Sequence, residues 1–231
     1  MNDVDVPEVL QDLSPGSDAA KLLKSYYQKT TNSGLPYFSG ARFNTLGIDS
    51  SGDNKPDEIT AEDVAAVLCL GVNLEGRAIV DLLENKRDKI SRLLQKLPRN
   101  TNLWDESQAA IERKGSDANE VWKLLRSIED IGPVKASKLM ARKRPRLIPI
   151  YDQWIDKALN LGSSRGYWTK YRNLMLMEVR GGMIIHEALE ALVLSLGLQE
   201  TVSPLRACDA ILWYWTNPGQ KEPRDRALGT Y

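Results

Sequence analysis

Apolar residues recur every three or four positions over most of this chain, which is the spacing of amphipathic helices. Val121, Leu124 and Ile128, for example, share one helix face. No segment has a convincing period-two pattern, although short strands are an alternative within the Gly- and Pro-rich stretch 31–58. The predicted fold class is therefore mainly α. Helices are expected over 18–30, 74–84, 87–97, 104–113, 117–128, 152–161, 167–179, 183–196 and 204–216, with others beginning near Thr60 and at Pro133.

Three of these helix starts carry recognisable signals. Thr60 followed by Asp63 resembles a capping box, in which each residue satisfies an amide of the other. Asp117 is suited to cap the helix over 117–128. Pro133 stands where proline is favoured, at the first helical position.

Charge is balanced over the whole chain but unevenly placed along it. The 231 residues include 31 Lys and Arg and 31 Asp and Glu, so the net charge is zero. This excludes a globally basic nucleic-acid coat protein. Residues 112–180 nevertheless hold 15 basic against 8 acidic residues, a net charge of +7, with the densest run at 142–146. That run predicts a polyanion-binding face or, as the alternative, an ordinary solvated helix end.

The chain offers few ligands for a metal and no membrane signal. Cys69, Cys208 and His186 are too few for a four-ligand Cys/His zinc site or a four-cysteine iron–sulfur cluster. We therefore expect no metal and no cofactor. No apolar stretch reaches the roughly 18 residues of a membrane helix, and the acidic N-terminus lacks an apolar signal region. We expect a cytoplasmic monomer that does not bind membranes.

The clearest local signal lies between two of the predicted helices. A helix ending at Ile128 is followed by a four-residue turn and by the helix that starts at Pro133. Gly132 permits backbone geometries that a side chain would hinder. The amides around Gly132, Val134 and Lys135 would lie unpaired at a helix N-terminus. Such amides, together with the helix dipole, favour an anion such as phosphate.

The run IEDIGPVKASKL, residues 128–139, resembles the helix-hairpin-helix DNA-binding motif, which here would span 121–143. Asp152 follows Gly132 by twenty residues, after an apolar segment. The combination is similar to the helix-hairpin-helix-GPD superfamily of DNA glycosylases, which includes endonuclease III. In that family a catalytic aspartate stands at about this distance, at the start of the next helix.

The resemblance implies a fold of two helical lobes that flank a DNA-binding cleft. A central lobe would cover 57–148 and contain the hairpin. A second, mostly helical lobe would combine 18–56 with 149–231. The tails, 1–17 and 218–231, are expected to be irregular.

The resemblance also implies roles for particular residues. Asp152 would be the catalytic residue, although it could simply cap the helix that follows it. The base pocket would draw on aromatic and basic residues for which packing is the plain alternative: Tyr151, Trp154, Tyr37, Phe38 and Arg42. Double-stranded DNA would be bound by Ile131, Gly132, Val134, Lys135, Lys138, Arg142, Lys143, Arg144 and Arg146.

Four departures from the family pattern refine this expectation. Asp130 replaces the first hairpin glycine, and its carboxylate is unfavourable close to a phosphate. Val134 stands where bifunctional members carry a Schiff-base lysine, so base removal without strand cleavage is expected. The family's iron–sulfur cysteines are absent, and the common Asp-Thr-His run reads Asp152-Gln153-Trp154.

The predicted function is therefore that of a monofunctional DNA glycosylase. It would hydrolyse the N-glycosidic bond of a flipped-out damaged or modified base and leave an abasic site. The divergence favours an unusual substrate, such as a modified cytosine in phage DNA, and hence antiviral defence. Base-excision repair of common lesions is one alternative. Others are a non-catalytic DNA-binding module and a helical interaction protein whose hairpin is only a structural turn.

Overall fold

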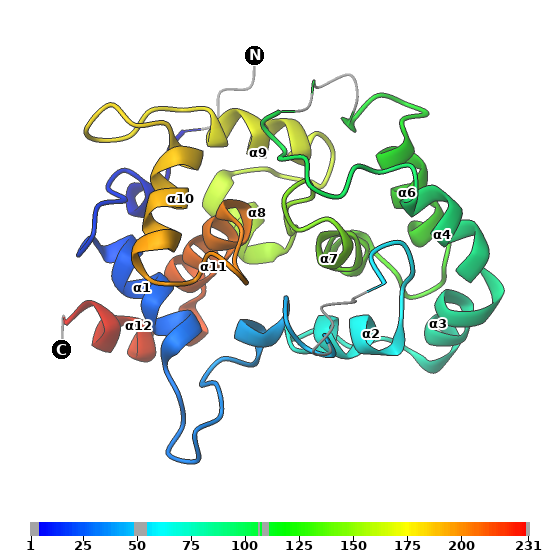
Figure 1. Ribbon diagram of the computed structural model, residues 1–231, viewed down its shortest axis with the longest axis horizontal. Coiled ribbons are helices and arrows are strands. Elements are labelled where there is room, and N and C mark those ends of the chain that lie inside the picture. The colour runs from blue at the N-terminus through cyan, green and yellow to red at the C-terminus, as the bar shows by residue number, and fades with distance from the viewer. Residues whose placement is uncertain (1–4, 49–54, 106, 108–110, 230–231) are drawn as a thin grey trace. The chain divides into compact units, whose positions relative to one another are not determined.

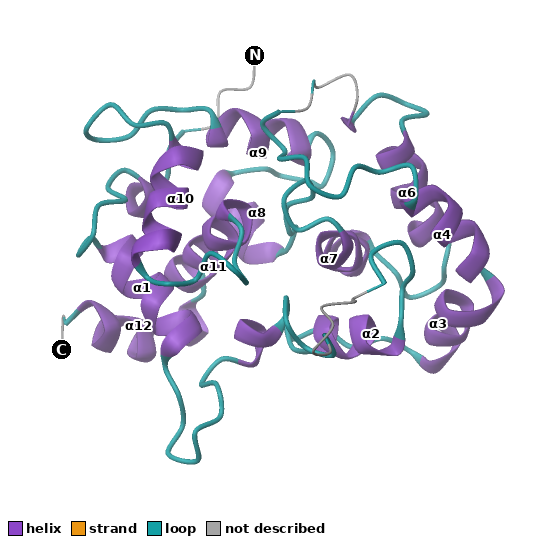
Figure 2. Cartoon of the chain, in the orientation of Figure 1, coloured by secondary structure: helices purple, strands orange, loops and turns teal. Residues whose placement is uncertain are grey.

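The protein is described by a computed structural model that covers residues 5–48, 55–105, 107 and 111–229 (Figure 1). These residues form helices joined by loops and contain no strand (Figure 2). The prediction of a mainly α fold is confirmed. Short strands within 31–58 are not formed by the described residues there, which adopt turns and the 3₁₀ helix η2 (Ser39–Arg42). None of the helices in the described ranges is long and apolar enough to cross a lipid bilayer.

The chain divides into two compact units, which we describe separately. Unit 1 combines residues 1–41 with 152–231, and unit 2 is the continuous stretch 42–151. The described residues 42–48 and 55–56 therefore group with the central helices, whereas the prediction placed them with the second lobe.

Two arginines of unit 2 explain why this segment belongs to it. Arg142 donates from Nη1 to the carbonyl of Phe43, and Arg144 donates from Nη1 to the carbonyl of Pro56 at 2.7 Å. The segment has little apolar sequence of its own, so these main-chain contacts could not be read from its hydrophobic pattern.

Unit 1 is organised around one buried helix, α11 (Pro204–Thr216). This helix packs against three others of the unit, α1, α8 and α10. Its sequence is apolar on nearly every side, which is typical of a helix at the centre of a core. The remaining elements are η1 (Glu8–Leu10), α1 (Asp18–Gln28), α8 (Gln153–Leu159), α9 (Tyr167–Met175), α10 (Ile185–Ser195), η4 (Pro218–Gln220) and α12 (Lys221–Leu228).

The C-terminal tail, predicted to be irregular, contains helix α12. Pro223 lies within its first turn, where proline removes an amide that has no intrahelical partner in any case. Glu222 and Arg226 form an ion pair one helical turn apart, which supports an exposed helix of polar sequence.

Unit 2 has α7 (Pro133–Lys143) packed against α2 and α6, with α4 packed against α6.

The capping box of Thr60 and Asp63 is confirmed, whereas Ser116, not Asp117, caps α6. The helix predicted over 74–84 is divided into α3 and a π-helical turn, η3. The helix predicted over 104–113 falls partly outside the described residues. The other elements are α2 (Ala61–Leu68), α3 (Gly76–Val80), η3 (Asp81–Asn85), α4 (Arg87–Leu94) and α6 (Asp117–Arg126).

Candidate functional site

The turn between α6 and α7, residues 127–132, is closed by an aspartate in an unusual conformation. Asp130 has a φ of +72°, in the left-handed region that glycine adopts most easily and that Asp tolerates better than most residues. Its Oδ2 accepts a hydrogen bond from the Glu75 amide at 2.8 Å, and its Oδ1 pairs with Lys135 Nζ. The hydrogen bond from Lys135 holds the pKa of Asp130 below its ordinary value. The Asp130 carboxylate therefore connects this turn to the start of α3 by a hydrogen bond, and it neutralises the Lys135 ammonium.

The main-chain amides predicted to bind phosphate fall into two groups. The amides of Ile131 and Gly132 donate within the turn, to the carbonyls of Ile128 at 3.1 Å and Asp130 at 3.2 Å. Gly132 is the N-cap of α7 and has no side chain to cap its first turn. The first-turn amides of Val134 and Lys135 are therefore the ones placed to meet an anion.

The basic residues at the end of α7 are inside unit 2, contrary to prediction. Arg142, Lys143 and Arg144 are 5%, 4% and 0% exposed, and Lys138, at 3%, donates to the Leu70 carbonyl at 3.1 Å. The expected DNA-binding face over these four residues is therefore wrong. Arg146 is half-buried and donates to Asn102 Oδ1 at 3.1 Å.

Two aspartates and several carbonyls satisfy this buried basic cluster, residues 142–144. Asp63 accepts from Arg142 Nε at 3.0 Å and pairs with Lys143 Nζ, and all three side chains are at most 2% exposed. Asp57 pairs with Arg144 Nη2 at 2.7 Å. Burial lowers the pKa of Lys143, and the neighbouring Asp63 only partly offsets this. The donors of the buried basic cluster are directed into unit 2, where they connect the end of α7 to Phe43, Pro56, Asp57 and Asp63.

Asp152 caps helix α8 of unit 1, as the plain alternative predicted. Its Oδ1 accepts hydrogen bonds from the amides of Trp154 at 2.9 Å and Ile155 at 3.0 Å. The residue is 8% exposed. Capping fixes the carboxylate in one position, which a catalytic role would also require, so the two roles are compatible.

The aromatic residues predicted for a base pocket do not share one environment. Phe38 is buried in unit 1 and stacks on Tyr26 with ring centroids 5.1 Å apart, so packing accounts for it. Tyr37 beside it is 43% exposed, and Arg42 is exposed. Trp154, in unit 1, is half-buried.

Tyr151 ends unit 2 and is fixed through its backbone. The Tyr151 amide donates to Ser137 Oγ at 3.0 Å, and its carbonyl accepts from the same hydroxyl at 3.1 Å. The apolar strip before Asp152 is thereby attached to the middle of α7. This attachment fixes where unit 2 ends, one residue before Asp152.

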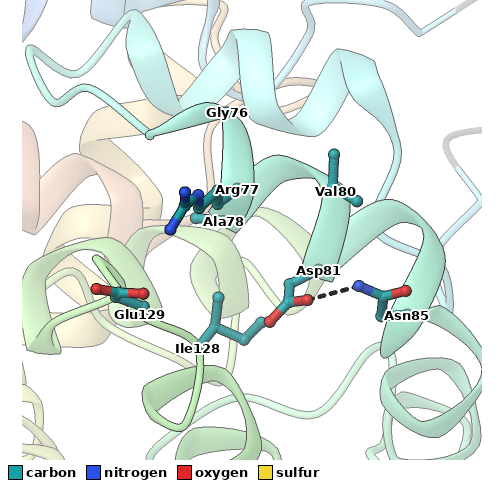
Figure 3. A pocket seen from close by; sticks show the side chains of 8 residues that line it. All are labelled: Gly76, Arg77, Ala78, Val80, Asp81, Asn85, Ile128 and Glu129. Atoms are coloured by element: carbon teal, nitrogen blue, oxygen red, sulfur yellow. Dashed lines mark hydrogen bonds between the residues drawn. The ribbon is translucent and has the colours of Figure 1, made fainter.

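A pocket of about 460 Å³ opens in unit 2 and is lined by residues of α3, of η3 and of the α6–α7 turn (Figure 3). Asp81 accepts a hydrogen bond from Asn85 Nδ2 at 2.7 Å within the π-helical turn, across from Ile128. None of the predicted catalytic, DNA-binding or base-pocket residues lines it, although Ile128 and Glu129 belong to the predicted hairpin motif, 121–143. The lining consists of Gly76, Arg77, Ala78, Val80, Asp81, Asn85, Ile128 and Glu129. Among the residues that the structure covers, no group of three or more His, Cys, Asp or Glu side chains is arranged to hold a metal ion.

Comparison with known proteins adds one assignment. A family model described as a family of unknown function (DUF6308) matches residues 19–216. The chain belongs to this DUF6308 family. No curated protein matches it, and no solved structure does. The α6–α7 turn and Asp152 both lie within the range that the DUF6308 model matches.

In this DUF6308 chain the acidic partners of the basic cluster are what sequence reasoning missed. Asp63 was interpreted only as a capping residue, yet the same carboxylate also neutralises the end of α7. One signal was available: α7 carries apolar or small residues such as Ala136, Leu139 and Met140 on several sides, which indicates a central helix. Cations at the end of a central helix are buried with it, and buried charges require partners of opposite charge.

Proposed function

We propose that this chain is a monofunctional DNA glycosylase that hydrolyses the N-glycosidic bond of a damaged or modified base. In this proposal α6, the α6–α7 turn and α7 form a helix-hairpin-helix that binds duplex DNA. Asp152 is the catalytic carboxylate. The carrying observation is the α6–α7 turn itself: an Asp in the left-handed conformation, then a Gly N-cap and a Pro that begins the second helix.

Binding would rest on one phosphate at the start of α7. The amides of Val134 and Lys135 supply donors there, and the helix dipole favours the negative charge. Because Lys138 and the buried basic cluster are directed inward, they are not part of the proposed interface. The electrostatic contribution to DNA affinity is accordingly small, and its salt dependence is expected to be shallow.

Catalysis would rest on a fixed negative charge. Breaking the N-glycosidic bond builds positive charge on the sugar, which an ionised Asp152 stabilises while it orients or deprotonates the attacking water. Two observations support hydrolysis without strand cleavage. Val134 has no amine, and the amine of Lys135 is engaged by Asp130, so neither is poised to attack the sugar.

The test is a base-release assay on duplex oligonucleotides and on genomic DNAs, including DNA with modified cytosines. Alkali treatment afterwards reveals abasic sites. Release from DNA with modified cytosines, but not from DNA with uracil or alkylpurines, would support a role in antiviral defence. Efficient release of uracil or alkylpurines would point instead to base-excision repair.

The second candidate function is a non-catalytic DNA-binding module, which the capping geometry favours. Asp152 already has a sufficient structural reason to be present, since it satisfies two amides of α8. Such a module binds duplex DNA but releases no base from any of the DNAs above.

A variant of Asp130 tests the proposed phosphate contact. In Asp130→Asn the side chain still tolerates the left-handed backbone and still accepts from the Glu75 amide, but it no longer neutralises Lys135. Duplex affinity is expected to rise, and the plot of log K against log[salt] should steepen by about 0.9, because one more phosphate is neutralised. Fluorescence anisotropy across a salt series measures both.

The matched control for this variant is Asp117→Asn, which changes the net charge equally. Asp117 lies at the other end of α6, in an exposed pair with Lys96 at 3.8 Å. Equal salt slopes for the parent and the Asp130 variant would show that phosphate does not approach Lys135, and would count against the proposed interface.

A further inference from the structure

The pocket in unit 2 holds an arginine and a glutamate that do not pair with each other. Arg77 belongs to α3 and Glu129 to the α6–α7 turn, and both line the pocket and are exposed. Neither side chain forms an ion pair or a hydrogen bond with another residue that the structure describes. Figure 3 shows the Arg77 guanidinium directed to the side of the pocket on which Glu129 lies, away from Asp81. Two opposite charges therefore face one cavity, and both are available to a ligand.

The π-helical turn η3 explains why Arg77 has no partner on its own helix. Arg77 and Asp81 are four residues apart, a spacing at which opposite charges pair on an α-helix. Here η3 begins at Asp81, which instead accepts a hydrogen bond from Asn85 Nδ2 at 2.7 Å and pairs with Lys86 Nζ at 3.5 Å. The turn supplies Asp81 with these partners and leaves the Arg77 guanidinium to the pocket. Single π-helical turns recur at functional sites in proteins.

Apolar side chains form the wall between the charged groups. Ala78 and Ile128 are each 2% exposed, and Val80 is 47% exposed. In Figure 3, Ile128 lies between Glu129 and Asp81. The volume of about 460 Å³ falls within the range of roughly 300–1,000 Å³ in which small-molecule sites lie. The pocket therefore matches a compact ligand that has a charged end and an apolar body.

The charges of the pocket select among such ligands. A guanidinium binds a carboxylate through two parallel hydrogen bonds. A carboxylate such as Glu129 binds an ammonium, and the C-terminal end of α6 beside it also favours a cation. A phosphorylated ligand is disfavoured, because its negative charges would meet the carboxylates of Asp81 and Glu129.

The two charges also distinguish a free amino acid from the end of a peptide. The N-terminal residue of a peptide has no free carboxylate at its own α-carbon, and the C-terminal residue has no ammonium there. Only a free amino acid carries both groups on one carbon atom, as the neighbouring positions of Arg77 and Glu129 require.

We propose that this pocket binds a free α-amino acid with an apolar side chain. Its carboxylate pairs with Arg77, its ammonium pairs with Glu129, and its side chain lies on the apolar wall. The ligand would join α3 to the α6–α7 turn, which the hydrogen bond from the Glu75 amide to Asp130 already connects. The inference does not rest on the proposed function, because no DNA takes part.

The experiment is isothermal titration calorimetry of the full chain with valine, leucine and phenylalanine. Two analogues of leucine each lack one charge: leucinamide lacks the carboxylate, and isocaproate lacks the ammonium. At least one of the three amino acids is expected to bind, and removal of either charge should weaken binding at least about tenfold, because a hydrogen bond between charged groups is lost. Binding of none of the three, or equal affinity for leucine and either analogue, would overturn the proposal.

Arg77→Gln and Glu129→Gln test the two residues, with Arg92→Gln on α4 and Glu190→Gln on α10 as controls that change the net charge equally. All four residues are exposed, so the fold should persist, and thermal unfolding checks this. Arg77→Gln should weaken leucine binding at least about tenfold and leave leucinamide affinity unchanged. Glu129→Gln should do the same for leucine and leave isocaproate affinity unchanged. Leucine affinities equal to those of the matched controls would overturn the proposal.

Discussion

Asp152→Asn is expected to abolish base release, by at least about a hundredfold, while duplex binding and folding persist. Asparagine caps helices about as well as aspartate, so its side-chain oxygen can still accept from the amides of Trp154 and Ile155. What is removed is the negative charge that would stabilise the sugar. The measurements are single-turnover base release, anisotropy with duplex DNA and thermal unfolding, on the same preparations.

The matched control is Asp156→Asn, which removes one acidic charge from the same helix. It should release the base at a rate close to that of the parent. If Asp152→Asn released the base as fast as the parent, Asp152 would be only a helix cap, and another group would have to be the catalytic one. The Asp152→Ala variant, which loses the cap as well, should also unfold at lower temperature, by the equivalent of about 1 kcal/mol.

Asp63→Asn is expected to have the largest effect on stability, lowering the free energy of unfolding by about 3–5 kcal/mol. The substitution retains an acceptor for the Thr60 amide but leaves the buried Arg142 and Lys143 without the carboxylate that they pair with. Removing one partner from a buried ion cluster costs far more than removing a surface pair, because the other charges remain desolvated. Urea unfolding followed by circular dichroism measures the loss.

Glu120→Gln provides the comparison for this prediction. Its partner is Lys123, both side chains are more than 40% exposed, and the expected change is below about 1 kcal/mol. Adding Lys143→Met to Asp63→Asn removes one of the stranded cations and should restore part of the loss. A destabilisation by Asp63→Asn no larger than that by Glu120→Gln would mean that water reaches the cluster.

Local signals were sufficient to locate the helix termini around the candidate site. The Gly132-Pro133 pair predicted where α7 begins, and Asp152 was recognised as suited to begin α8. Both signals act over three or four residues, through caps and through the fixed φ of proline. The polar sequence of α12 led to the wrong prediction of an irregular tail. A helix that is stabilised by an ion pair and by packing need not show an apolar stripe.

The environment of the basic residues could not be predicted in this way. A run of Arg, Lys and Arg is exposed in most proteins, and whether it is buried depends on acids far away in sequence. Here Asp57 and Asp63 lie about eighty residues before the cations they neutralise. The pocket at the π-helical turn was missed because one extra residue per turn at 81–85 leaves no trace in hydrophobic spacing.

The discontinuity of unit 1 has a consequence for synthesis on the ribosome. All of unit 2, residues 42–151, emerges before α11 and α12, the two helices that α1 packs against, have been made. Until α11 appears, α1, with the apolar residues Leu22 and Leu23, has only η1 among its packing partners. On the ribosome, unit 2 can therefore fold before unit 1, while the N-terminal part of unit 1 is still incompletely packed. This is the stage at which a chaperone would be needed most.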